Sequence, residues 1–326
     1  MAFADIYGHE NQITILKTAM ANHRIAHAYL FYGMAGIGKR TTALAFAKAL
    51  NCLQPLDYDA CDTCPSCRKA ERKNHPDIVT VEAEGQFIRI NNIRDIQNQM
   101  QFKPFEGARR VVMVLDADKM NAAAANALLK TLEEPSAGNM LILTTARFYQ
   151  LPVTVLSRCQ HIRFNPLPNE KIGSYLQKRM SIDPHTAGRL ASASGGSIGR
   201  ALAMNNDVFI EERDEIFHTL LAADEQHLLK MLFFIGDLAA RPKTIAEKLN
   251  LMKFCFRDAL VYRETGEKNN LINNDCLDEI KELSKRLSGG DILNNIKAVD
   301  EALTAIERNA NKQLTLDTMM FRLTLK

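Results

Sequence analysis

The feature that most constrains the fold of this chain is a glycine-rich loop that separates a short apolar run from a helical run. The apolar run covers residues 28–32, and the loop reads Gly33-Met34-Ala35-Gly36-Ile37-Gly38-Lys39. Between a strand and a helix, such a loop turns its backbone N–H groups around phosphate oxygens, and the helix N-terminus adds a favourable dipole. We therefore predict a nucleotide-binding loop in which Gly33, Gly36 and Gly38 allow the turn and Lys39 reaches the phosphates.

The apolar pattern of the first half alternates strands with helices. Strand-sized apolar runs occur at residues 28–32, 78–81, 111–115, 140–143 and 161–164. Helical runs follow the first and third of them, from about residues 41 to 52 and 121 to 134. Apolar strands separated by helices indicate a parallel sheet that is covered on both faces. The first half therefore reads as α/β.

Pro166 and Pro168 end this pattern, and the remaining sequence is helical, with amphipathic runs such as residues 231–234. At 326 residues the chain is long enough for two or three domains. We predict an α/β class followed by an all-α part. The expected domains are a nucleotide-binding core over residues 1–166, a small helical lid over 167–206 and a helical collar, or oligomerisation domain, over 207–326.

The predicted nucleotide site lacks two groups that hydrolysis needs. The residue after the lysine is Arg40, which has no lone pair for Mg²⁺, and Thr41 is rotated by about 100° around the helix. Asp116 ends an apolar strand where a Mg²⁺-linked carboxylate belongs, but Ala117 replaces the glutamate that orients the attacking water. Losing such a group costs on the order of 10²–10⁴ in rate. ATP and Mg²⁺ stay candidate ligands of a degenerate site, with weak or absent hydrolysis.

Four of the seven cysteines, Cys52, Cys61, Cys64 and Cys67, fall within sixteen positions. This spacing can bring four thiolates to one tetrahedral Zn²⁺ with no open coordination position, which is the pattern of a structural site. Reduced free thiols or a redox pair are the alternatives for cysteines in a reducing compartment. We therefore predict structural zinc in this insert.

Two further runs resemble a known family. Residues 128–135 read Leu-Leu-Lys-Thr-Leu-Glu-Glu-Pro, and residues 151–159 end in Ser-Arg-Cys. Together with residues 24–31 and the four-cysteine insert, they resemble AAA+ clamp-loader subunits over the whole chain, most thinly over the last hundred residues. The resemblance implies an AAA+ fold with a P-loop sheet domain, a helical lid and a helical collar.

The resemblance also implies roles for particular residues. Arg158, in the Ser-Arg-Cys motif, matches an arginine finger that reaches the ATP of an adjacent subunit. Thr145 lies near the family's sensor-1 position at the end of a strand. Gly199 occupies the sensor-2 position where active members carry arginine, with Arg200 displaced by one residue. This is a third departure at the same nucleotide site.

The implied function is that of a stator-like clamp-loader subunit in bacterial DNA replication, with weak or no ATPase and no polymerase site of its own. The implied partners are γ/τ motor subunits and a δ subunit in a heteropentameric ring, with the sliding clamp and primer–template DNA reached through the assembly. Whether the chain is itself an enzyme stays open.

Two alternatives remain. An active AAA+ ATPase motor subunit would need Thr41 to hold Mg²⁺ and Asp118 to replace the missing glutamate. A zinc-containing DNA or protein interaction module would carry a vestigial P-loop, but the net charge of +3 gives it no support. No apolar run reaches membrane-spanning length and the N-terminus does not resemble a signal peptide, so we expect a cytoplasmic protein without a membrane partner.

Overall fold

The computed structural model describes residues 1–205, 207–222, 245–307 and 310–324. The predicted amphipathic run at 231–234 lies outside these residues. The chain divides into two units: Met1–Pro184 with Ser194–Ala201, and His185–Ala193 with Leu202–Lys326. The domain bounds predicted at residues 166 and 206 stay a prediction. Among the described helices, none combines the length and the apolar character that crossing a membrane requires.

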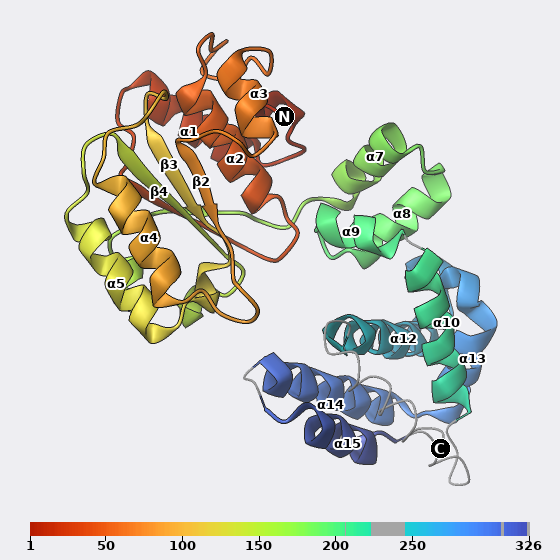
Figure 1. Ribbon diagram of the computed structural model, residues 1–326. Helices are drawn as coiled ribbons and strands as arrows, with labels where there is room; N and C mark the ends of the chain where they lie inside the picture. The colour runs from red at the N-terminus through yellow and green to blue at the C-terminus, as the bar shows by residue number, and fades with distance from the viewer. Residues whose placement is uncertain (206, 223–244, 308–309, 325–326) are drawn as a thin grey trace. The chain divides into compact units, whose positions relative to one another are not determined.

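The first unit contains a five-stranded, fully parallel sheet with the strand order β2-β3-β4-β1-β5 (Figure 1). The strands are β1 (Ala28–Tyr32), β2 (Ile78–Val81), β3 (Arg110–Val114), β4 (Asn139–Thr145) and β5 (Gln160–Arg163). The bounds of each strand lie within two residues of a predicted apolar run, and the predicted α/β class is confirmed. Because the strands are parallel, the loops that follow β1, β3 and β4 leave the same edge of the sheet.

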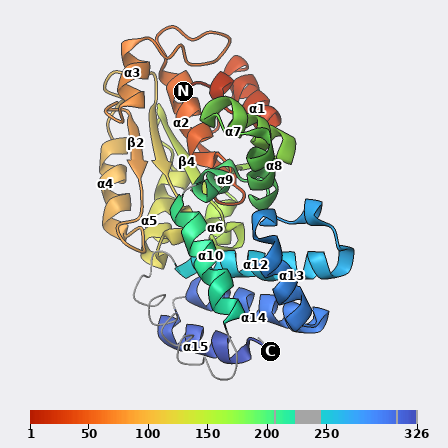
Figure 2. The ribbon, with the colours of Figure 1, turned by 90° about the vertical axis from the view of Figure 1, so that its right-hand side faces the viewer.

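Helices cover both faces of this sheet (Figure 1, Figure 2). Tyr29 and Phe31 of β1 pack in one core with α1 (Glu10–Ala21) and α2 (Lys39–Asn51). The alternate residues Ala28 and Leu30 pack in a second core with helices of the opposite face. Those helices are α4 (Ile90–Met100), α5 (Ala122–Glu133) and α6 (Val153–Leu156). Apolar residues on both sides of each strand thus explain the continuous apolar runs.

Short elements connect these layers and continue the chain beyond the sheet. Helix α3 (Pro65–Glu71) lies between α2 and β2, and 3-10 turns cover Phe3–Asp5, Ala117–Lys119 and Phe148–Gln150. After β5 come α7 (Asn169–Met180), α8 (Pro184–Ala193) and α9 (Ile198–Met204).

The second unit is helical, as predicted. Its longer helices are α10 (Asp207–Leu221), α12 (Ile245–Thr265), α13 (Leu277–Arg286), α14 (Gly289–Glu307) and α15 (Lys312–Arg322), with 3-10 turns at Lys268–Asn270 and Asn274–Cys276. One apolar core joins these helices, and Phe217, Phe256 and Val299 are buried in it. Helix α12 contacts α10, α13 and α14, so it forms the centre of this core.

Candidate functional site

The predicted phosphate-binding loop lies between β1 and α2, as the sequence predicts. Gly36 and Gly38 have φ values of 71° and 110°, which favour glycine. A Cβ atom on Gly33, also at positive φ, would lie 2.3 Å from the carbonyl oxygen of Phe164. The three glycines are therefore required by the backbone and by its close approach to β5.

Lys39 points back into this loop. Its Nζ donates hydrogen bonds to the carbonyl oxygens of Gly33 at 2.7 Å and Met34 at 2.8 Å. The residue is buried, and this burial lowers the pKa of Lys39 although the carboxylates of Asp116 and Asp118 act in the opposite direction. The amine that would contact a phosphate is thus bonded to its own loop.

The metal side of the site has no hydroxyl at the expected position. The guanidinium of Arg40 forms an ion pair with Glu82, just after β2, at 2.7 Å. Thr41 is half-buried in the first turn of α2, and Thr42 is fully buried and donates its hydroxyl to the carbonyl oxygen of Gly38 at 3.0 Å. The Arg40 side chain, which stands at the position expected for a metal-binding hydroxyl, is therefore paired with a residue just after the end of β2.

The acidic residues of the site lie beyond the end of β3, which is Val114. Asp116 adopts a left-handed conformation, with φ 51° and ψ 54°, and its carboxylate pairs with Lys119 at 3.0 Å. Asp118 lies in the 3-10 turn and accepts a hydrogen bond of 2.6 Å from the hydroxyl of Thr145, which is fully buried. Ala117 is buried in the sheet core. The structure therefore brings Thr145 and Asp118 together.

Sequence reasoning did not find this pair. Alternation of side chains holds only inside an extended strand, and β3 ends at Val114. The chain turns at Asp116 before Asp118 is placed, so the alternation rule does not apply there. The left-handed conformation at Asp116 could not be predicted, because it occurs at an aspartate and not at a glycine.

The predicted arginine finger lies on the surface of the first unit. Arg158 follows α6 and is partly exposed, and its guanidinium pairs with Glu133 of α5 at 2.7 Å. It also donates to the carbonyl oxygen of Thr154 at 2.9 Å. The same segment exposes two apolar side chains, Tyr149 and Val153. A partly exposed arginine with exposed aromatic and aliphatic neighbours in sequence is typical of a protein interface.

The residues on either side of Arg158 act in local structure. The hydroxyl of Ser157 donates to the carbonyl oxygen of Thr154 at 3.1 Å, which closes the turn. Burial raises the pKa of the Cys159 thiol to about 12, so it stays protonated and unreactive at neutral pH.

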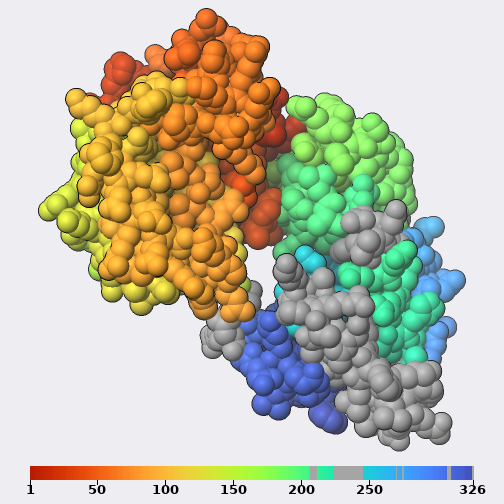
Figure 3. All heavy atoms as spheres, in the orientation of Figure 1, coloured from red at the N-terminus to blue at the C-terminus, as the bar shows by residue number. Residues whose placement is uncertain are grey.

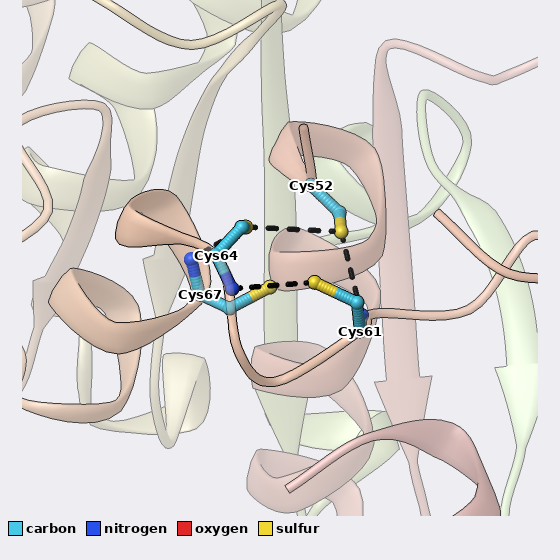
Figure 4. Close-up of side chains that lie close together, drawn as sticks. All are labelled: Cys52, Cys61, Cys64 and Cys67. Atoms are coloured by element: carbon cyan, nitrogen blue, oxygen red, sulfur yellow. Dashed lines mark hydrogen bonds between the residues drawn. The ribbon is translucent and has the colours of Figure 1, made fainter. Parts of the chain in front are cut away.

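The four predicted metal ligands lie together (Figure 4). Cys52 follows α2, Cys61 lies in the connecting loop, Cys64 caps α3, and Cys67 lies within α3. Their four Sγ atoms are all within 4.8 Å of one another. A tetrahedral ion with Zn–S bonds of about 2.3 Å would place the sulfurs about 3.8 Å apart. The cluster can therefore hold a metal ion, and its donor set fits zinc.

Local hydrogen bonds favour the metal-binding form of this cluster. The backbone N–H groups of Cys61, Cys64 and Cys67 each donate to the sulfur of the preceding cysteine at 3.4 Å. Hydrogen bonds from Thr63 and from the Cys64 N–H lower the pKa of Cys61 to about 6. By contrast, burial raises the pKa of the Cys67 thiol. A bound cation would offset that cost, because it favours the thiolate.

The cysteine insert is fastened to the sheet unit by a buried lysine. The Nζ of Lys48 on α2 lies 2.6 Å from a carboxylate oxygen of Asp62 and 2.6 Å from one of Glu71. Burial alone would lower the pKa of Lys48, but the two carboxylates outweigh it and raise this pKa. Ser66 adds a hydrogen bond of 2.7 Å to the Asn51 carbonyl. The segment around α3, orange in Figure 3, lies on the outside of this unit.

The glycine loop after β1, the covered parallel sheet and the all-α part that follows define an AAA+ P-loop protein. Residues 8–168 match the family model described as DNA polymerase III, delta subunit, and residues 208–324 match the model of its C terminal part. The DNA polymerase III subunit δ′ of Bacillus subtilis is 31% identical over 95% of this chain and 94% of that protein. The δ′ subunit of Pseudomonas aeruginosa is 36% identical over 77% of this chain and 76% of that protein. The chain therefore belongs to the family of DNA polymerase III δ′ subunits.

The chain is also similar to tau/gamma subunits. The DNA polymerase III subunit tau/gamma of Haemophilus influenzae is 33% identical over 63% of this chain, but this match spans 30% of that protein. The resemblance to AAA+ clamp-loader subunits is thus confirmed, and the match to the δ′ subunit of Bacillus subtilis spans nearly the full length of both chains.

Proposed function

We propose that this chain is a stator-like δ′ subunit of a bacterial clamp loader, with weak or no ATPase of its own. We further propose that Arg158 is an arginine finger that reaches the ATP bound by a neighbouring subunit. The observation that carries the proposal is the contrast between the surface position of Arg158 and the altered nucleotide site of the same unit. A guanidinium beside the γ-phosphate stabilises transition-state charge and is worth about 10³–10⁵ in rate in other NTPases.

Three departures support a weak ATPase. The guanidinium of Arg40 is paired with Glu82 at the position of the metal-binding hydroxyl, and Ala117 is buried at the position of the catalytic glutamate. Gly199 replaces the sensor-2 arginine. The remaining candidate nucleotide-binding residues are Gly33, Gly36, Gly38, Lys39, Thr41, Asp116 and Thr145.

The proposed setting is a heteropentameric ring in the cytoplasm, with γ/τ motor subunits and a δ subunit as partners. The sliding clamp and primer–template DNA are reached through this assembly during DNA replication. The helical lid over residues 167–206 and the collar over 207–326 complete the subunit, and the collar supplies the oligomerisation surface. The similarity to δ′ and tau/gamma proteins supports this setting.

We propose zinc as the ion of the cysteine cluster, with Cys52, Cys61, Cys64 and Cys67 as ligands. Four thiolates fill a tetrahedral shell, so no position is left for a substrate or water. The role of this ion is to fix the insert between α2 and α3.

The arginine finger is tested in a loader reconstituted from purified subunits. Arg158→Ala is expected to depress the DNA-stimulated ATPase, because the site beside this subunit loses a group worth about 10³-fold or more. The assembly itself should persist on gel filtration. Arg163→Ala, which removes an exposed arginine of β5, is the matched control and should leave the rate unchanged. An unchanged ATPase in assembled Arg158→Ala loader rules out the finger.

The second measurement uses the isolated chain. Its Mg²⁺-dependent ATP turnover is expected to stay at background, because the metal-side hydroxyl and the catalytic carboxylate are replaced. A turnover near about 1 s⁻¹, at the low end for ordinary enzymes, would instead identify an active motor subunit.

A further inference from the structure

The start of α9 and the residue before it, Ser197, lie directly on the P-loop. The N–H of Gly199 donates a hydrogen bond to the carbonyl oxygen of Gly36 at 2.8 Å. The hydroxyl of Ser197 donates one to the carbonyl oxygen of Ala35 at 2.9 Å. Both segments belong to the first unit, because Ser194–Ala201 groups with the sheet. The carbonyl groups at the tip of the loop are thus bonded to a segment about 160 positions later in the chain.

The approach is so close that both positions must be glycine. A Cβ atom on Gly199 would lie 2.8 Å from the Cα of Gly36 and 2.9 Å from its carbonyl oxygen. A Cβ atom on Gly36 would lie 2.7 Å from the hydroxyl of Ser197. These separations are shorter than ordinary van der Waals contacts. Backbone therefore packs on backbone, and any larger residue at 199 would push this segment off the loop.

The rest of the loop is bonded in the same way. Lys39 donates hydrogen bonds to the carbonyl oxygens of Gly33 and Met34. The Nε2 of His9 forms a hydrogen bond of 2.8 Å with the carbonyl oxygen of Ile37. Five successive carbonyl groups, from residue 33 to residue 37, thus form hydrogen bonds, two with the loop's own lysine and three with other parts of the chain. His9 and the segment Ser197–Gly199 hold the loop from outside, and the lysine amine is bonded within it.

We propose that the segment Ser197–Gly199 is a latch that fixes the P-loop in an arrangement in which the Lys39 amine is bonded to its own loop. A triphosphate needs the Lys39 amine to leave the carbonyl oxygens of Gly33 and Met34. The latch opposes the shift of the loop that accompanies this release, because it holds the next two carbonyl groups, those of Ala35 and Gly36. A protein whose binding-competent conformation is rarely populated binds its ligand more weakly by that fraction. This inference deepens the proposed weak ATPase: glycine at position 199 both removes a sensor arginine and lets this segment pack on the loop.

Gly199→Ala in the full chain tests the latch. The φ of Gly199 is outside the left-handed region, so the added methyl group is opposed chiefly by the P-loop backbone. The matched control is Gly188→Ala on α8, where a Cβ would meet nothing within 4 Å. The probe is an ADP analogue with a fluorescent N-methylanthraniloyl group, titrated in EDTA so that the altered metal position plays no part.

We expect Gly199→Ala to bind the probe about tenfold tighter than the unchanged chain, the effect of roughly one hydrogen bond. Gly188→Ala should match the unchanged chain. Amide hydrogen exchange in the peptide that covers residues 33–39 should accelerate in Gly199→Ala and stay the same in the control. Ser197→Ala, which removes one bond without adding a group, should give smaller changes in the same direction.

Unchanged probe affinity in both Gly199→Ala and Ser197→Ala overturns the latch, and so does unchanged exchange in the loop. An equal gain in Gly188→Ala also overturns it, because that position does not touch the loop. None of these results alters the Arg158 test, which measures ATP turnover in a neighbouring subunit. The latch and the arginine finger can therefore fail separately.

Discussion

The cysteine cluster and the P-loop lie in the same unit and begin from equally clear sequence motifs, but their polar atoms are arranged in opposite ways. In the cluster, four sulfur atoms converge within 4.8 Å, as a single ion requires. In the P-loop, Lys39 is bonded to two carbonyl groups of its own loop, and the next three carbonyl groups are bonded to other parts of the chain. A site built for a ligand leaves its donor atoms aimed at a common point. In the P-loop, by contrast, the lysine amine and the loop carbonyl groups form hydrogen bonds within the chain.

The largest expected effect is loss of the metal in Cys64→Ser. The purified chain should contain about one zinc ion, and the variant should lose it, because apparent zinc affinities of structural sites of about 10–16 kcal/mol depend on the full ligand set. Metal content is measured by mass spectrometry together with the melting temperature.

The control for this loss is Cys159→Ser, which removes a half-buried cysteine outside the cluster. It should keep its zinc. Full metal content in Cys64→Ser would mean that the converging sulfurs are ordinary reduced thiols, and the contrast between the two sites would disappear.

A smaller effect is expected at Asp77, which precedes β2. This buried carboxylate accepts hydrogen bonds from the N–H groups of Phe105, Glu106 and Gly107 and pairs with Arg110. Burial would raise the pKa of Asp77, but these bonds outweigh it and hold this pKa below its usual value. Asp77→Asn should lower the free energy of unfolding at pH 7 by about 2–4 kcal/mol, because it leaves buried donors poorly paired.

The pH dependence has a defined sign. A carboxyl group whose pKa is depressed in the folded state stabilises the fold above its unfolded pKa of about 3.9, and this contribution is lost as the pH falls through the folded pKa. The difference between the unchanged chain and Asp77→Asn should therefore shrink below about pH 4. Denaturant unfolding at several pH values measures it. Asp95→Asn, on the exposed side of α4, is the control, and a gap that persists in acid contradicts the assignment.

The sheet and the two sites differ in how far the sequence reveals them. The buried parallel strands are predictable because each is a continuous apolar run, and the cysteine cluster because its spacing brings the ligands together. Helix α4 was not predicted, although Ile93, Ile96 and Met100 have helical spacing and are buried. That signal was present in the sequence among polar residues.

The contacts between the P-loop region and distant parts of the chain could not be predicted. The bonds of Ser197 and Gly199 to the loop, and of Arg40 to Glu82, join residues that are distant in the chain. Nothing local distinguishes these side chains from solvated ones. The sequence motif therefore shows which residue types stand at the positions of the P-loop, while the structure shows which partners those residues contact.

An intermediate effect is expected for Lys39→Met. In a working P-loop this change removes a phosphate contact and abolishes turnover. Here the lysine amine satisfies two carbonyl groups, so its loss should cost about 1–3 kcal/mol of unfolding free energy and leave the ATPase of the assembled loader unchanged. The control is Lys119→Met, which breaks an exposed ion pair with Asp116. It should lower the free energy of unfolding by less than Lys39→Met does. Loss of loader ATPase in Lys39→Met would show that this P-loop does take part in nucleotide turnover.

The smallest effect is expected for Glu133→Gln, which tests a third arrangement of polar atoms. Arg158 is held by an exposed ion pair with Glu133, and such pairs are worth about 0–1 kcal/mol, so the arginine can leave it for a phosphate at little cost. Glu133→Gln should therefore change the melting temperature little and leave the loader ATPase undiminished, in contrast to Arg158→Ala. Glu134→Gln, at the next exposed position, is the control. If Glu133→Gln instead lowered the ATPase as much as Arg158→Ala, the carboxylate would be part of the working interface, and Arg158 would need that partner while it acts.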